Sequence, residues 1–254
     1  MKVTVLGCGT SGGVPKAPEY WGQCDPANPR NRRSRASVHV TGADGTSILF
    51  DTSPDLRTQV LDNGITRLDG VFLTHDHADH VHGIDDLRGF FHVREGVPVP
   101  VHGTRDTMDV VTGRFNYVFH SQTGYPAIAE ARIITPGEPV SVGDLTVTAF
   151  EQQHGPVMSL GLRVGDVAYS TDVETLPESA FEALAGVKVW IVDALRRRPH
   201  PTHAHLDRTL DWIARLRPER AILTHMDWSM DYDTLRRELP DGVEPGFDGL
   251  CVTV

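Results

Sequence analysis

The sequence has 254 residues, and its composition excludes several classes of protein. The formal net charge of −10 disfavours a protein that coats nucleic acid, although a small phosphorylated ligand could still bind at a local positive site. No run of about 18 apolar residues could cross a bilayer, and the three scattered cysteines predict neither a disulfide framework nor a thiolate zinc site. These features predict a cytoplasmic protein with one domain over residues 1–254.

Short runs of β-forming residues, bounded by Gly, Asp, Asn or Pro, recur along the chain and predict strands. In chain order they are KVTVLG, SVHVTG, TSILFDT, GVFLTH, VPVHG, LTVTAFE, LGLRVG, VAYSTD, VKVWIVDA and RAILTH. One helix is predicted after Ser53, its expected N-cap, with Pro54 at the first helical position and Gly64 past its end. Further helices are predicted near residues 85–91, 104–115, 177–184, 206–216 and 233–239. This order favours an α/β fold in which two sheets pack face to face with helices outside.

The segment FLTHDHADHVHG, residues 72–83, places imidazoles and carboxylates directly behind an apolar run. In an extended segment residues i and i+2 project to one side, so His75 and His77 can converge on one point. The turn after Ala78 brings Asp79 and His80 round to a second point. The segment therefore predicts two adjacent cation sites.

Further ligands are predicted where other strands end. His154 follows LTVTAFEQQ, Asp172 ends VAYSTD and His225 ends RAILTH. Imidazole and carboxylate ligands suit zinc, manganese or iron, and two such ions about 3.5–4 Å apart need an anionic bridge, which Asp172 can supply. Because a water held by such ions has a pKa of about 7, the pattern indicates a hydrolase with two divalent ions, zinc or manganese, and a bridging hydroxide.

The motif THDHADH, with the later ligands at these intervals, resembles the metallo-β-lactamase superfamily over nearly the whole chain. The resemblance implies a four-layer αββα sandwich. It also implies two sets of metal ligands that share Asp172. These are His75, His77 and His154 for one ion, and Asp79, His80 and His225 for the other. Asp79 is also predicted to be catalytic.

Within that superfamily the chain is most similar to the phosphodiesterase branch. The segments GCGTSGGVP, WGQC, RSRAS and PTHAHLDRTLDWIARLRPERAILTH resemble the cyclic-phosphate phosphodiesterases of the carbon–phosphorus lyase pathway and, more distantly, tRNase Z and the pyrroloquinoline-quinone biosynthesis B proteins. That resemblance implies a general acid at His203, with His205 as the alternative. A nearby helix N-terminus would favour the neutral imidazole, and a hydrogen bond to Asp207 or Asp227 would offset that effect.

Supporting roles are predicted for a few further residues. Asp51 and Asp193 follow buried strands and are candidates for hydrogen bonds to histidines of the site, although Asp51 could instead cap the next helix. If His203 is the acid, His205 is predicted to support a histidine of the site or to contact the substrate. Arg35 belongs to the basic stretch Arg30–Arg35, which suits phosphate, although charge runs are usually solvated.

The leading hypothesis is a binuclear phosphodiesterase that acts on a small linear or cyclic phosphodiester, with a histidine general acid. One alternative is a thioester or lactone hydrolase of the same superfamily. Another is a metal-binding carrier in cofactor biosynthesis that catalyses no reaction. The expected partner is a small phosphorylated substrate rather than a membrane or a nucleic acid, and the apolar segment FNYVFHSQTGYP predicts a homodimer contact.

Overall fold

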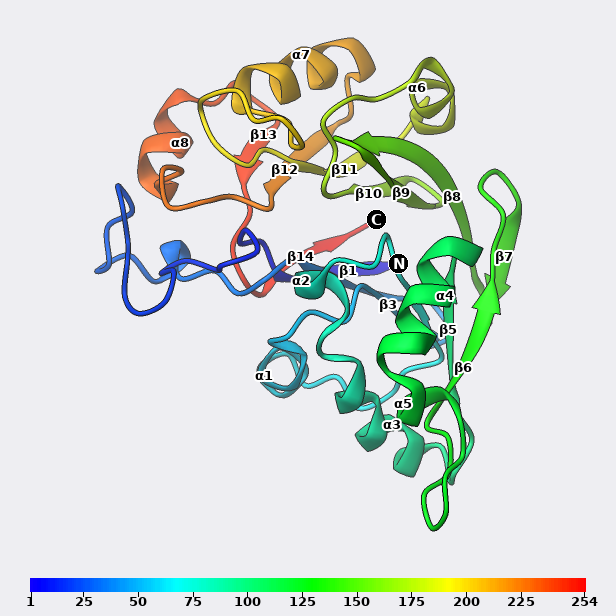
Figure 1. Cartoon of the computed structure of the whole chain (residues 1–254). Coiled ribbons are helices and arrows are strands. Elements are labelled where there is room, and N and C mark those ends of the chain that lie inside the picture. The colour runs from blue at the N-terminus through cyan, green and yellow to red at the C-terminus, as the bar shows by residue number, and fades with distance from the viewer.

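Two seven-stranded β-sheets form the centre of the structure, a computed structural model that describes all 254 residues. They pack face to face, as Figure 1 shows. The first sheet contains, from edge to edge, β14 (Leu250–Thr253), β1 (Lys2–Gly7), β2 (Ser37–Thr41), β3 (Ser47–Phe50), β4 (Gly70–Phe72), β5 (Val99–Gly103) and β6 (Ala129–Ile133). The second contains β13 (Val243–Pro245), β12 (Arg220–Thr224), β11 (Val189–Asp193), β10 (Val167–Ser170), β9 (Val157–Val164), β8 (Leu145–His154) and β7 (Pro139–Val142).

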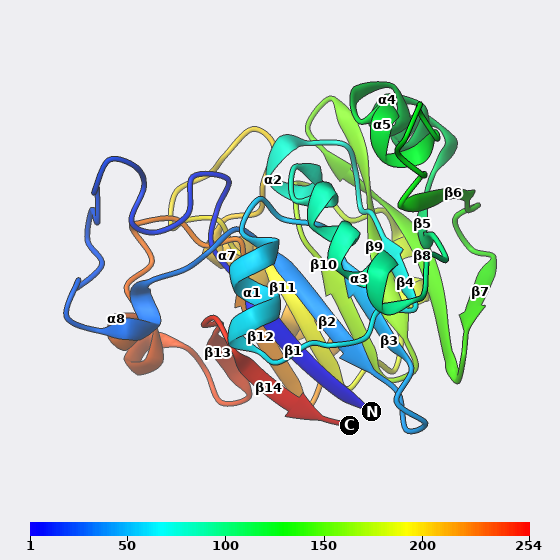
Figure 2. The same cartoon turned by 90° about the horizontal axis from the view of Figure 1, so that it is seen from below.

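Helices cover the outer face of each sheet, which gives four layers (Figures 1 and 2). Against the first sheet lie α1 (Leu56–Asp62), α3 (Leu87–Val93), α4 (Arg105–Arg114) and α5 (Asn116–Phe119). Against the second lie α6 (Glu178–Leu184), α7 (Leu206–Leu216) and α8 (Tyr232–Glu238). The connections hold α2 (Ala78–Val81) and the 3-10 helices η1 (Pro29–Asn31) and η2 (Ile84–Asp86). The predicted αββα sandwich is confirmed. With 11 residues, α7 is the longest helix, so none could span a bilayer.

The central strands of the first sheet are buried on both faces. Because side chains alternate along a strand, Ile48 and Phe50 of β3 join the 41-residue core between the sheets. Leu49, between them, joins a separate 19-residue core beneath the outer helices. This double burial explains why β3 appears in the sequence as a continuous apolar run rather than an alternating one.

The parallel part of each sheet determines where the polar strand ends meet. β3 pairs in parallel with β4 in the first sheet, and β11 pairs in parallel with β10 and β12 in the second. Carboxyl ends of parallel strands lie at the same edge of a sheet. Asp51 directly follows β3, Asp193 closes β11 and His225 directly follows β12. The fold therefore places the polar residues at the ends of separate strands together at one end of the sandwich.

Most predicted elements form where the sequence indicates them. The helix predicted over residues 206–216 has those bounds. The helix predicted to begin at Pro54 begins instead at Leu56, because the Ser53 carbonyl accepts from the amide of Leu56 in a tighter turn, and the amide of Gln59 donates to the carbonyl of Asp55 in the α-helical pattern. The sequence patterns miss all four edge strands, β6, β7, β13 and β14. Edge strands have one neighbour and more exposed side chains, so their apolar pattern is weak, as in β6.

A close contact between β8 and β9 generates a stability prediction. Gly161 pairs with Phe150, and a Cβ added at Gly161 would lie 2.1 Å from the Phe150 ring. We therefore expect Gly161→Ala to lower the free energy of unfolding by about 1–3 kcal/mol. Gly113→Ala, in open space on α4, is the control and should raise it by about 0.5–1 kcal/mol. Urea unfolding followed by circular dichroism measures both, and equal midpoints would contradict the prediction.

Candidate metal centre

The residues predicted as metal ligands come together at one end of the sandwich. Their ligand atoms form two groups, within each of which all atoms lie within 4.8 Å of one another. The first group is His75, His77, His154 and Asp172, and the second is Asp79, His80, Asp172 and His225. His77 is exposed, Asp79 is partly buried and the others are buried, so the site is open to solvent on the side of His77.

Asp172 belongs to both groups, and each of its carboxylate oxygens faces one of them. Oδ1 lies 3.1 Å from His80 Nε2 and 3.2 Å from His225 Nε2. Oδ2 lies 3.7 Å from His75 Nε2 and 3.5 Å from His154 Nε2. This is the arrangement expected of a carboxylate that bridges two cations.

Asp51 fixes the orientation of two imidazoles from behind. Its Oδ2 accepts from His80 Nδ1 at 2.8 Å, and the Thr74 hydroxyl, 3.0 Å from the same oxygen, donates to this carboxylate. The Thr74 oxygen is then free to accept from His75 Nδ1 at 3.0 Å. Both rings therefore present an unprotonated Nε2 to the centre when neutral. The alternative role of Asp51 as a helix cap is wrong, because Asp55 precedes α1.

The donor set fits divalent cations. His75 Nε2 and His80 Nε2 are buried and have no hydrogen-bond partner, although both face Asp172. Burial, and the charge of His80, hold the pKa of His75 well below its usual range, so that ring is neutral. Burial also lowers the pKa of His80, but the charges of Asp172 and Asp79 raise it well above its usual range. The buried negative charge thus attracts a cation, and without a metal ion a proton on His80 fills that role.

The backbone at the site adopts an uncommon conformation. Five non-glycine residues in the chain have a positive φ, and Asp51 (62°), Asp172 (50°) and His225 (56°) are among them. Each follows a strand directly or within two residues. Left-handed backbone of this kind persists only where the surrounding structure enforces it, and it concentrates at functional sites.

His203 lies beside both ligand groups and is held by a carboxylate. Its Nδ1 donates to Asp193 Oδ2 at 2.9 Å, and its Nε2 faces Asp172 Oδ2 at 3.8 Å. Burial lowers the pKa of His203, but the charges of Asp193 and Asp172 raise it to about 9. The prediction that a carboxylate offsets the helix N-terminus holds in direction, but the partner is Asp193 and neither Asp207 nor Asp227.

His154 is oriented by a backbone carbonyl. Its Nδ1 donates to the carbonyl oxygen of Thr202 at 2.6 Å, which leaves Nε2 unprotonated and turned toward the centre. The sequence gives no signal for this contact, because any residue supplies a carbonyl. The partner of His75, in contrast, is the hydroxyl of Thr74, the residue directly before it in the chain.

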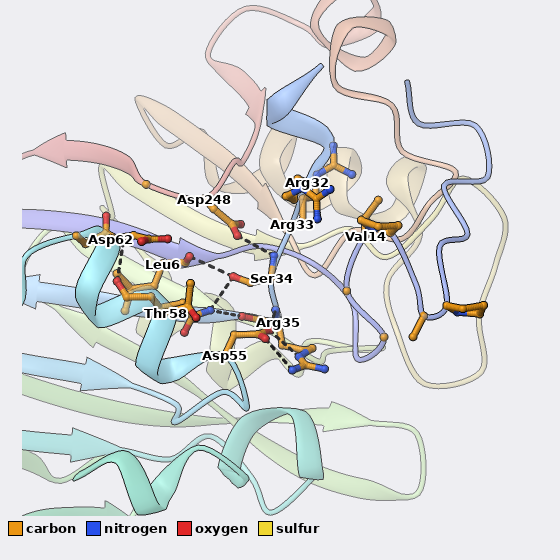
Figure 3. Close-up of a pocket in the computed structure, with 18 residues that line it drawn as sticks. Leu6, Val14, Arg32, Arg33, Ser34, Arg35, Asp55, Thr58, Asp62 and Asp248 are labelled. Atoms are coloured by element: carbon orange, nitrogen blue, oxygen red, sulfur yellow. Dashed lines mark hydrogen bonds and ion pairs between the residues drawn. The ribbon is translucent and has the colours of Figure 1, made fainter. Parts of the chain in front are cut away.

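Two other predicted residues lie outside the clusters. His205 caps α7 and is absent from every group of ligand atoms, so the geometry favours His203. Arg35 lines a cavity of about 590 Å³, where its guanidinium pairs with Asp55 at 2.7 Å. Figure 3 shows Arg35 facing Asp55, and the backbone amide of Ser34 donating to Asp248. A contact of Arg35 with substrate would therefore compete with an existing ion pair.

The remaining arginines of the basic stretch also have partners inside the protein. Arg30 lies over the rings of Tyr232 and Phe247, with the guanidinium carbon 4.9 and 5.0 Å from their centroids. Arg33 is buried and donates to the carbonyl oxygen of Met230 at 2.7 Å. The stretch thus fastens the N-terminal loop to the segment after β12.

Comparisons with known proteins agree with this arrangement. The model of the Beta-lactamase superfamily domain matches residues 46–226. A crystal structure of a diphosphatase from the PhnP family has a TM-score of 0.90 and 33% identity, covering 100% of this chain and 97% of that chain. Zn²⁺-bound PqqB from Methylobacterium extorquens has a TM-score of 0.81 with 20% identity, covering 100% of both chains, a likeness of fold.

A longer relative matches almost the whole chain. The octanoyltransferase from Porphyromonas gingivalis is 33% identical over 254 residues, which is 98% of this chain but 51% of that protein. The chain therefore spans about half the length of this relative. The family model covers well over half of the chain, and the fold and the His/Asp clusters agree with it. The chain belongs to the metallo-β-lactamase superfamily.

Proposed function

We propose that the protein is a metal-dependent phosphodiesterase that hydrolyses a small linear or cyclic phosphodiester. The observation that carries the proposal is the position of His203, held by Asp193 against the two ligand groups. A phosphodiester that breaks a P–O bond expels an alkoxide, and that oxygen needs a proton. The protein thus has a candidate proton donor next to a candidate metal centre.

In this proposal the two groups would hold two divalent ions, zinc or manganese, with Asp172 as the ligand that the groups share. Bound ions would neutralise the phosphoryl oxygens and supply hydroxide at neutral pH. The chain contributes ligand atoms in fixed positions. Asp79 Oδ2 lies 3.2 Å from His80 Nε2 and 3.3 Å from His225 Nε2, so Asp79 completes the second group. Asp79 is therefore both a proposed ligand and a residue beside the reacting group.

His203 is the proposed general acid. Its ring centroid lies 4.6 Å from that of His154 and 4.8 Å from that of His225, so it stands over the gap between the two groups. Asp193, which also accepts from the amide of Val173, holds Nδ1 and leaves Nε2 to carry the proton that is transferred. Asp193 is a positioning residue in this scheme.

The PhnP-family diphosphatase supports the choice of bond. Hydrolysis of a diphosphate and hydrolysis of a phosphodiester both break a P–O bond at a negatively charged phosphorus, so the same metal centre suits both, and the alkoxide expelled from a phosphodiester adds the need for an acid. We expect the partner to be a small phosphorylated molecule, because the net charge of −10 repels long nucleic acids. We also propose that the protein acts in the cytoplasm. The segment of residues 115–126, with exposed Tyr117 and Tyr125, remains the proposed homodimer contact.

A thioester or lactone hydrolase is the second candidate, and the name of the octanoyltransferase relative favours acyl chemistry. The chain spans only 51% of that protein, and a thiolate leaving group needs no general acid. Parallel assays of a thioester and of bis-p-nitrophenyl phosphate distinguish the two candidates. If the protein binds two ions but hydrolyses neither substrate, the result would favour the other alternative hypothesis, a metal-binding carrier.

Removal and replacement of metal should change stability. Because a ligand that binds only the folded state stabilises it, chelated protein should melt at a lower temperature, and zinc or manganese should restore the transition. Asp51→Asn should weaken metal binding by about 10–100-fold, since it removes the charge that orients His80. Calorimetric titration with each metal measures the affinity and should give two ions per chain.

Asp248→Asn is the matched control for this measurement. Asp248 is a buried carboxylate that contacts Ser34 and Cys8 and no proposed ligand, and burial raises its pKa to about 6. The control should bind metal as the wild type does. Unchanged metal affinity in Asp51→Asn would contradict the assigned role of Asp51.

Loss of the general acid should depend on the leaving group. We expect His203→Ala to reduce kcat by about 10²–10⁴-fold for a diester with an alkyl leaving group, and by much less for bis-p-nitrophenyl phosphate, whose leaving group is stable without a proton. His205→Ala is the control and should behave like the wild type. A loss of less than a few fold on the alkyl substrate, with metal content intact, argues against the phosphodiesterase scheme.

The pH profile should report the pairing of His203 with Asp193. Because the charge of Asp193 raises the pKa of His203, the acid is protonated at neutral pH and kcat should fall as pH rises through about 9. Asp193→Asn removes that charge, so the alkaline limb should move to lower pH by roughly one to two units. An alkaline limb that stays in place in this variant shows that His203 is not the titrating group.

A further inference from the structure

A groove of about 700 Å³ borders the proposed metal centre between α4 and the β8–β9 hairpin. Thr74 and Asp76 line it, and these residues flank His75 in the chain. Val157 also lines it and pairs with His154 across the hairpin. Figures 1 and 2 show α4 beside the edge where β6 and β8 approach each other. The groove therefore begins at the two segments that carry the first ligand group.

Exposed apolar side chains are concentrated in this groove. Ten large apolar residues of the chain are exposed, and four of them line this groove. These are Val110 (42% exposed), Ile133 (46%), Val157 (38%) and Met158 (47%). Scattered apolar residues are ordinary on a protein surface, but a group of them in a concave site marks a place where a ligand is desolvated.

The charges around the groove do not favour a second anionic group. Asp76 is paired with Arg114 at 3.4 Å, which leaves Arg105 against Asp106 and Glu151. The lining thus has one unpaired cation and two carboxylates. A further phosphate or an oligonucleotide would be repelled, whereas an uncharged chain would lose little by entering.

We propose that this groove binds an uncharged apolar ester group of the substrate, the group that stays on phosphorus. The inference rests on the proposed function. His203 lies against His154 and His225, so the leaving oxygen belongs on that side. The groove opens from the side of Asp76, where exposed His77 leaves the centre open to solvent. The proposed substrate is therefore a phosphodiester whose retained ester group is alkyl or aryl.

A series of p-nitrophenyl alkyl phosphates with methyl, butyl and hexyl groups tests the inference on metal-loaded protein. The leaving group is constant in this series, so only the retained chain varies. We expect kcat/KM to rise about two- to fourfold for each added methylene, the upper figure corresponding to full burial. Rates that do not depend on chain length would overturn the inference.

A double variant locates the effect in the groove. Val110→Thr with Met158→Gln keeps the shape of both half-exposed side chains and replaces apolar atoms with polar ones, so the dependence on chain length should flatten. Leu61→Gln with Val97→Thr makes comparable apolar-to-polar exchanges at exposed positions outside the groove and should retain the dependence. A double variant in the groove that retains the full dependence would contradict the assignment.

Binding of alkylphosphonates separates this inference from the proposed function. Absence of turnover for every diester would refute the phosphodiesterase, yet calorimetry with methyl-, butyl- and hexylphosphonate would still report on the groove. A Kd that falls with chain length in the wild type, but not in the groove variant, supports the apolar subsite. A Kd that is the same for all three phosphonates overturns it.

Discussion

The buried carboxylate of Asp172 is the charge around which the site is organised. Burial raises its pKa, but the charges of His225, His80 and His203 lower it well below the usual range, so it stays ionised. An ionised group in a dry site must be compensated, and here imidazole nitrogens on both sides face its two oxygens. That demand explains why hydrogen bonds at Nδ1 hold His75, His80 and His154 with Nε2 toward the centre. It also explains why the centre suits cations.

The fold meets this demand through its strand ends. The two sheets contribute ligands from opposite sides, with the segment after β4 on one and the ends of β8, β10 and β12 on the other. Asp172 and His225 take left-handed backbone there, a conformation that the packed strands on either side can enforce. The strands thus hold carboxylates and imidazoles together in positions that no single loop could maintain.

One residue type serves different purposes within a few ångströms. His75 and His154 have lowered pKa values, mainly because they are buried, and are suited to bind a cation as neutral rings. His203 has a raised pKa because Asp193 and Asp172 outweigh its burial, and is suited to donate a proton. The surroundings of each ring therefore set its pKa. The groove beside α4 adds an apolar surface next to this polar centre.

The sequence by itself determined the αββα class and the candidate ligands, because the THDHADH segment and the polar stops after apolar runs are local patterns. It also indicated His203 ahead of His205. Only the tertiary structure decided the partner of His203, since Asp193 lies on a different strand end, and the carbonyl of Thr202 as the anchor of His154. The edge strands and the groove likewise depend on which elements become neighbours, and contacts between distant segments leave no periodicity in the chain.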